Sequence, residues 1–170
     1  MDPFDDFGLF RFSLPALESL SFRVDYNLGA NFHLELPGDL FRLVSSPPTR
    51  LHHLALHGCY GSPIWTIRNL TSFELAGGGD PLEPIYLDQS EFLPFISGNQ
   101  SLVSLSLSCC SFPDPAQLSQ VTPVILPELK SLRLMENYGL SGFPGLVDIP
   151  PSSHSLHFGS WSRDALPPVF

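Results

Sequence analysis

The sequence predicts an α/β fold in which a curved parallel sheet of about six short strands carries short helices and loops on its convex side. Three observations lead to this fold class. A six-residue frame, apolar-x-x-apolar-x-apolar, recurs along the chain of 170 residues. Its copies start at residues 17, 51, 70, 102, 129 and 153, with a mean step of about 27 residues. Eighteen prolines and thirteen glycines interrupt the chain often, so short elements are expected.

Each frame predicts one strand, because its apolar and polar residues alternate with period two. A single strand of this kind cannot bury its apolar side alone, so successive copies must stack into one parallel sheet. The residues between the frames then supply the crossover connections. The mean step lies within the roughly 20–29 residues of leucine-rich repeats, so the sequence predicts a leucine-rich-repeat solenoid. The frames are Leu17-x-x-Leu20-x-Phe22, Leu51-x-x-Leu54-x-Leu56, Leu70-x-x-Phe73-x-Leu75, Leu102-x-x-Leu105-x-Leu107, Leu129-x-x-Leu132-x-Leu134 and the degenerate Ser153-x-x-Leu156-x-Phe158.

A turn position follows each frame by three residues, where leucine-rich repeats place Asn or Cys. Cys59, Cys110 and Asn137 fit this pattern, and we expect them to be buried and to serve the turn rather than any chemistry. Period-two alternation then predicts that Cys109, the neighbour of Cys110, is exposed. The other three frames have different residues at this position, namely Asp25, Gly78 and Trp161.

The connections between frames differ in length, and the long ones predict helices. A short helix is expected over Leu36–Val44, with a proline in its first turn. A second is expected through 91–96, capped by Ser90 and closed by Gly98. The step of 19 residues around Trp65 leaves no room for much helix, and 111–127 is a proline-rich loop with at most one turn at 116–120. The expected organisation is an edge strand or cap over 1–13, the repeat domain over 14–161 and a tail over 162–170.

The charge of the chain bears on its partners. Seventeen acidic residues against eight lysines and arginines give a net charge of −9, which repels nucleic acid and anionic membrane surfaces. No apolar stretch approaches the roughly 18 residues of a membrane span. Three cysteines, two of them adjacent, do not suggest a disulfide framework. We therefore expect an intracellular protein, cytoplasmic or nuclear, that binds neither nucleic acid nor membrane.

The chain carries a Leu-Pro-x-Leu-x-Ser-Leu element at 14–20 and again at 126–132, together with the stretch 50–59, the pair Ile64-Trp65 and the stretch 69–75. These segments resemble the leucine-rich-repeat region of the F-box protein group of mushroom-forming fungi. The similarity covers residues 14–160 and implies the substrate receptor of a cullin-type ubiquitin ligase. The residues before Leu14 cannot form the F-box that docks on the ligase adaptor, so we expect adaptor binding only if an upstream F-box exists. The alternative is a stand-alone structural or regulatory repeat protein with no link to a ligase.

The x positions of the frames predict the surface that meets a partner, because they point to the concave face of a solenoid. Serine dominates these positions. Two interpretations remain open: the hydroxyls merely solvate the sheet, or a few larger polar groups contact another protein from a floor of small residues. The second interpretation selects Arg23, His53, His57, Glu74, Arg133 and His157.

Catalytic and metal sites are not expected. His52 and His53 point to opposite sides of a strand, and His53 and His57 are about 13 Å apart along it, so a shared zinc site would need ligands from elsewhere. Gly77-Gly78-Gly79 lacks the Gly-Lys-Ser/Thr of a phosphate loop, and no Gly-x-Ser-x-Gly occurs. The sequence therefore predicts no enzyme, no cofactor and no metal.

Overall fold

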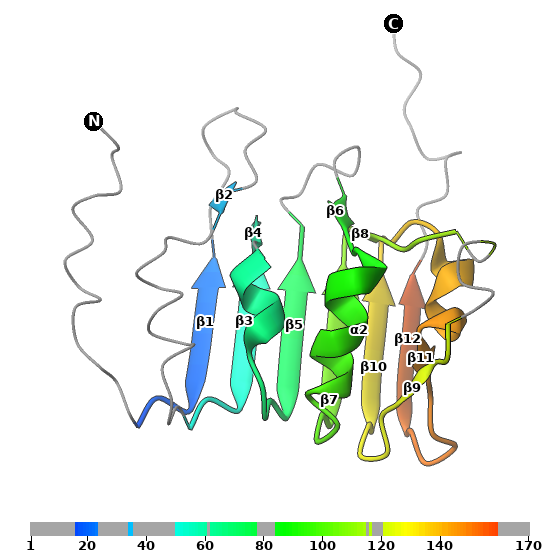
Figure 1. Cartoon of the computed structure of the whole chain (residues 1–170). Coiled ribbons are helices and arrows are strands. Elements are labelled where there is room, and N and C mark those ends of the chain that lie inside the picture. The colour runs from blue at the N-terminus through cyan, green and yellow to red at the C-terminus, as the bar shows by residue number, and fades with distance from the viewer. Residues whose placement is uncertain are drawn as a thin grey trace, which may run out of the picture.

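The computed structural model describes residues 16–23, 34–35, 50–60, 62–77, 84–114, 116 and 121–159. At its centre is a six-strand parallel sheet in the order β1-β3-β5-β7-β10-β12 (Figure 1). The predicted α/β class and the six short parallel strands are confirmed. The strands are β1 (Ser19–Arg23), β3 (His53–His57), β5 (Ser72–Ala76), β7 (Ser104–Ser108), β10 (Ser131–Met135) and β12 (Ser155–Gly159).

The register of the sheet follows the frames. Every strand begins at the third frame position, and equal positions lie side by side, so that Leu54 pairs with Leu20 on one side and Phe73 on the other. A backbone contact precedes each of the last five strands in the same way. For example, Thr71 N and Ser72 N both donate to the carbonyl of His52, and the equivalent bonds in all five places measure 2.8–3.1 Å. The recurring frame thus becomes a recurring backbone geometry.

Short helices cover one face of the sheet. These are η2 (Ser62–Thr66), α2 (Gln89–Ser97) and η4 (Leu140–Gly145), all in front of the strands in Figure 1. Helix α2 turns its three buried side chains, Phe92, Phe95 and Ile96, toward the sheet. Parallel neighbours need a crossover between them, because each strand must start again from the same end of the sheet. The strands are added in one direction, so crossovers of the same hand all lie on one face.

The helix expected between the third and fourth frames is present, but its predicted N-cap is wrong. Asp88, not Ser90, caps α2: its Oδ1 accepts from Ser90 N and Ser90 Oγ, both at 2.7 Å. Asp88 has extended backbone angles and a carboxylate that satisfies a free N–H of the first turn, so the helix begins at Gln89. Gly98 closes the helix as predicted, and its N–H donates to Pro94 O.

Three further pairs of two-residue parallel strands were not predicted. They are β2 (Leu34–Glu35) with β4 (Cys59–Tyr60), β6 (Ile85–Tyr86) with β8 (Cys110–Ser111), and β9 (Val124–Ile125) with β11 (Val147–Asp148). Left-handed residues turn the chain just after three of the main strands: Gly58 (φ 71°), Cys109 (φ 52°) and Glu136 (φ 57°). Strand β4 follows the corner at Gly58 and β8 follows the corner at Cys109, and beyond Glu136 a single bridge joins Tyr138 to Ser111.

This corner also explains why the predicted exposure of Cys109 is wrong. The residue is 7% exposed, because its left-handed backbone ends the period-two alternation that would have turned the side chain outward. Its Sγ donates to Glu136 Oε2 at 3.5 Å, and its N–H donates to Met135 O. Cys59 and Cys110 are fully buried, as the turn position predicts.

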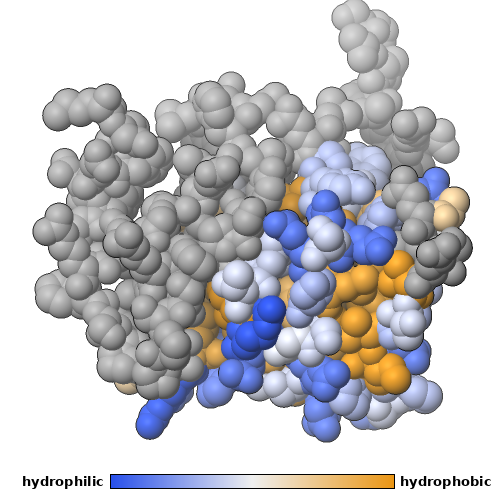
Figure 2. Space-filling view, viewed as in Figure 1, coloured by the Kyte–Doolittle hydropathy of each residue, from blue (hydrophilic) through white to orange (hydrophobic). Residues whose placement is uncertain are grey.

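The core lies between the sheet and the helices. Phe95 of α2 packs on Phe73 of β5, with ring centroids 4.7 Å apart, and Trp65 of η2 meets Phe95 edge-on at 5.4 Å. The core is less well covered toward β12, where Leu156 and Phe158 are 48% and 57% exposed although their partners in β10 are buried. Figure 2 shows apolar surface to the right of α2, toward the last strands.

Some sequence-based expectations lie outside the described residues. They are the cap over 1–13, the helix over Leu36–Val44, the tail over 162–170 and the turn residues Asp25, Gly78 and Trp161.

Candidate functional site

The face of the sheet opposite the helices is built from the outward side chains of the six strands. We call it the serine face, since eight of its eighteen residues are serines. Its residues are half-buried or exposed, whereas the alternate residues of β3, β5, β7 and β10 are buried. No described element covers this face. It therefore offers small hydroxyl groups at the spacing of the strands, about 4.8 Å.

The middle of the serine face is the outward side of β7, which consists of serines alone: Ser104, Ser106 and Ser108. We call these three residues the β7 serine row. Glu74 of β5 and Arg133 of β10 lie in register with Ser106 on its two sides. With two strand spacings between them, their Cα atoms are roughly 10 Å apart. A row of small side chains is thus bordered by one acid and one base.

Three of the predicted residues come together on the N-terminal side of the row. His57 Nε2 lies 3.4 Å from Glu74 Oε1, and the two side chains are 22% and 45% exposed. Arg23 is in register with His57 on the neighbouring strand β1. The carboxylate of Glu74 thus already has an imidazole partner on the protein.

Arg133 and His157 come together on the other side of the row. They are direct register partners on β10 and β12, and both are exposed. His53 belongs to neither group: its register partners are Ser19 and Ser72, and it lies about 13 Å along β3 from His57. The structure therefore divides the six predicted residues into two groups and one separate histidine.

The serine face differs in charge from the rest of the protein. It carries two of the chain's eight lysines and arginines and three of its six histidines, but only one of its seventeen acidic residues. The described acidic groups elsewhere include Asp88 and Glu91 at α2 and Asp148 in β11, on the helix layer. A protein of net charge −9 thus presents a weakly cationic face.

The cysteines have no reactive character. Burial raises the pKa of Cys59 to about 11, and burial together with the hydrogen bond to Glu136 raises that of Cys109 to about 11. Burial also raises the pKa of Cys110. All three thiols are free and stay protonated at neutral pH, so they are weak nucleophiles. In the described ranges no three His, Cys, Asp or Glu side chains gather as metal ligands.

Two buried asparagines hold the scaffold beneath this face. Asn137, the predicted turn residue, accepts from Cys110 N at 2.7 Å and donates to Leu107 O at 2.8 Å. The structural role of Asn99 was not predicted from the sequence. Asn99 is fully buried, accepts from Leu70 N at 2.9 Å, and donates to Ile67 O and Phe95 O at 3.0 and 2.8 Å. Its position just before the frame at Leu102 was the available signal.

No protein-family model matches the chain, and it has no match among curated proteins or solved structures. These comparisons do not test the resemblance to F-box proteins that the segments 14–20, 50–59, 69–75 and 126–132 and the pair Ile64-Trp65 suggest. Over the part of the chain that the structure describes, no helix is long and apolar enough to cross a membrane.

Proposed function

We propose that this chain is a leucine-rich-repeat module that binds another protein through the serine face. The observation that carries the proposal is the two-sidedness of the sheet: six in-register strands with one face packed under helices and the other covered by no described element. A repetitive scaffold that presents a broad row of strand side chains is the usual docking surface of solenoids.

The leucine-rich-repeat assignment is supported by three features of the repeat itself. Each strand begins at the third frame position, the crossovers run on one side, and the turn position holds buried Cys or Asn in three repeats. Asn137 forms hydrogen bonds with the backbone of the preceding repeat, as expected of an asparagine at the turn position.

Binding is the role we propose, rather than catalysis. The thiols are held protonated, and the one acid–imidazole contact of the serine face, His57–Glu74, lies beside small strand residues on an open sheet. Catalytic groups need a water-excluding site in which charge development is stabilised, whereas an open face of small residues suits a large partner.

Within this role, a substrate receptor of a ubiquitin ligase is the candidate that the resemblance favours. A stand-alone regulatory module is the alternative. Copurification of the natural protein from the cells that express it separates them: a ligase receptor should carry the ligase adaptor with it, and a stand-alone module should not.

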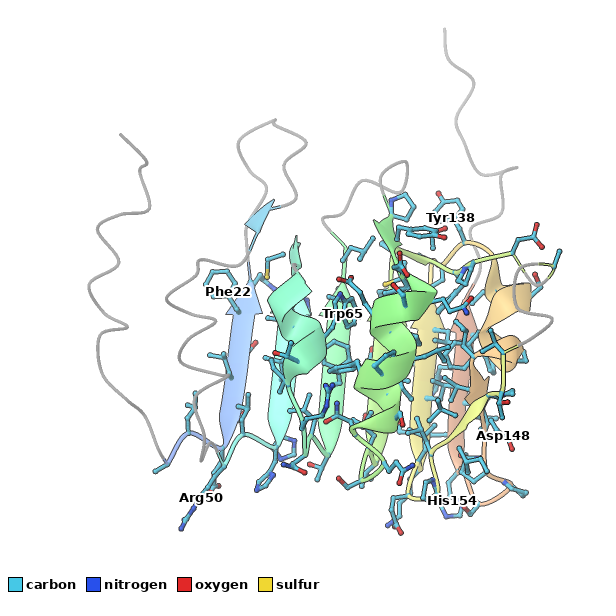
Figure 3. The ribbon with its side chains drawn as sticks, viewed as in Figure 1. Phe22, Arg50, Trp65, Tyr138, Asp148 and His154 are labelled. Carbon is cyan, nitrogen blue, oxygen red and sulfur yellow. The ribbon has the colours of Figure 1, made fainter. Side chains whose placement is uncertain are left out.

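The test of the binding face is a double substitution, His57→Ala with Arg133→Ala. The matched control is Arg50→Ala with His154→Ala, which also removes one arginine and one histidine. Both control residues are exposed and lie at the edge where the strands begin (Figure 3). A partner captured from cell extract is identified and titrated against each variant, and folding is checked by circular dichroism.

The face variant should weaken binding by more than about tenfold, since arginine contacts at the centre of an interface contribute strongly. The control variant should bind like the wild type. Equal affinity of the folded face variant would remove the serine face from consideration.

A further inference from the structure

The serine face has a charge opposite to that of the protein around it, and this points to the chemistry of what it binds. Arg23 and Arg133 are its permanent cations, and Glu74 is its one acid. The carboxylate of Glu74 is 3.4 Å from the imidazole of His57, so it already has a polar partner within the protein. Arg133 has no such acid in register: its partners are Ser106 and His157.

We infer that the serine face takes an acidic segment of a partner protein, which lies along the β7 serine row with its carboxylates toward Arg133. This inference rests on the proposed function and specifies its ligand. Three features of the row favour a carboxylate. The arginine fork donates two parallel hydrogen bonds to one carboxylate, the serine hydroxyls beside it are donors, and their small size leaves room for an added chain.

The surrounding acidity decides between a short segment and a long polyanion. At physiological salt, the field of a surface charge fades over about 8 Å. A short acidic segment over β7 is therefore governed by Arg133 and its neighbours. A nucleic acid would extend beyond the face onto a protein whose remaining charge is strongly negative, and would be repelled there.

Glu74 limits and orients this binding. It borders the β7 serine row on the side opposite Arg133, so a carboxylate placed over Ser106 is attracted from one side and repelled from the other. Removal of the Glu74 charge should consequently strengthen the binding of an acidic segment, whereas removal of the Arg133 charge should weaken it. A face that merely solvates the sheet would show neither effect.

The experiment uses the full chain and fluorescein-labelled homopeptides of about ten residues, long enough to span a five-residue strand. Anisotropy titrations compare oligo-Glu, oligo-Gln and oligo-Lys near neutral pH at low salt. The variants are Arg133→Gln and Glu74→Gln, with exposed Arg50→Gln as the matched control. Oligo-Glu should bind at least about tenfold more tightly than oligo-Gln. Arg133→Gln should remove most of this difference, Glu74→Gln should tighten binding about threefold, and Arg50→Gln should leave it within about twofold.

The opposite outcomes overturn the inference. Absence of oligo-Glu binding, undiminished oligo-Glu binding in Arg133→Gln, or an equal loss in Arg50→Gln would each do so, provided that circular dichroism shows folded protein. Tighter binding of single-stranded oligo(dT) than of oligo-Glu would reassign the face to another class of ligand.

The same data separate this inference from the proposed function. If the His57→Ala, Arg133→Ala variant loses its captured partner but oligo-Glu does not bind the wild type, the binding function stands and the acidic ligand falls. If oligo-Glu binds but the captured partner is indifferent to the face variant, the proposed function falls.

Discussion

Asn99 is the side chain whose removal should damage the fold most for its size. It is fully buried and joins the end of α2 to the connection before β5: it accepts from Leu70 N and donates to Ile67 O, and it also donates to Phe95 O within α2. The substitution Asn99→Ala removes all three bonds and leaves a void at a place with no access to solvent. Leu70 opens the third frame and Phe95 is a core residue of α2, so the bonds tie helix to sheet.

The magnitude follows from the groups that lose a partner. Each buried backbone group left without a hydrogen bond costs about 1–3 kcal/mol. Three such groups, with some relaxation around the void, give a loss of about 4 kcal/mol in the free energy of unfolding. This is a large part of the roughly 5–15 kcal/mol by which domains are stable.

Urea denaturation followed by circular dichroism measures this loss. With an m-value of about 2 kcal/mol/M, the midpoint should fall by about 2 M. The substitution Asn137→Ala, which removes two buried hydrogen bonds, should lower the urea midpoint by less. Gln100→Ala is the control, because Gln100 is the exposed neighbour of Asn99. It should change the free energy of unfolding by no more than about 0.5 kcal/mol.

A loss below about 1 kcal/mol for Asn99→Ala would refute this reasoning, since it would mean that the three backbone groups find other partners. If Asn99→Ala does not fold at all, Asn137→Ala still decides the point. A loss in that variant no larger than in Gln100→Ala would show that buried asparagine bonds do not hold this sheet together.

Four further outcomes are expected. The three cysteines should resist a thiol reagent in the native protein at pH 8 and react once it is denatured; rapid native labelling would contradict their burial. Burial raises the pKa of Cys59 and Cys109 from 9.0 to about 11. Their contribution to stability is therefore present below pH 9 and is lost between pH 9 and 11, because the unfolded chain ionises first. An unchanged melting temperature from pH 8 to 10.5 would contradict this. Gly77→Ala should lower stability by about 1–3 kcal/mol, because the added Cβ would lie 2.8 Å from both Cβ and the carbonyl oxygen of Cys109, and an unaltered melting temperature would exclude the clash. Phe158→Ser should lower the free energy of unfolding by less than about 1 kcal/mol, whereas Phe73→Ser, in the fully buried centre, should lower it by more than about 3 kcal/mol; equal losses would contradict the difference in exposure.

The sheet could be predicted from the sequence because each frame repeats the same pattern of apolar and polar residues. Apolar residues at fixed offsets must face one way, and the register then follows once copies stack, as the pairing of Leu54 with Leu20 and Phe73 shows. The turn position also predicted the burial of Cys59 and Cys110 and the role of Asn137. These features are local patterns repeated many times.

Other features could not be predicted, since they depend on single backbone angles or distant contacts. The left-handed φ of Cys109 buries a side chain that alternation would expose, and no residue pattern marks such an angle. Asp88 and Ser90 are both good caps, and only the helix start at Gln89 decides between them. The frames place the six larger polar side chains on the outward side of the strands, but the contact of His57 with Glu74 depends on the diagonal placement of two strands, which the sequence does not specify.

The backbone bonds that precede the strands have a consequence for how the protein opens. Each joins a strand only to the one before it, as Ser155 N is joined to Lys130 O ahead of β12. Opening an end strand therefore breaks one set of contacts, and opening β5 or β7 breaks two. Amide protons should exchange fastest in β12, whose inward side chains are half exposed, and slowest in β5 and β7. A partner seated over β7 would then rest on the slowest-opening part of the sheet.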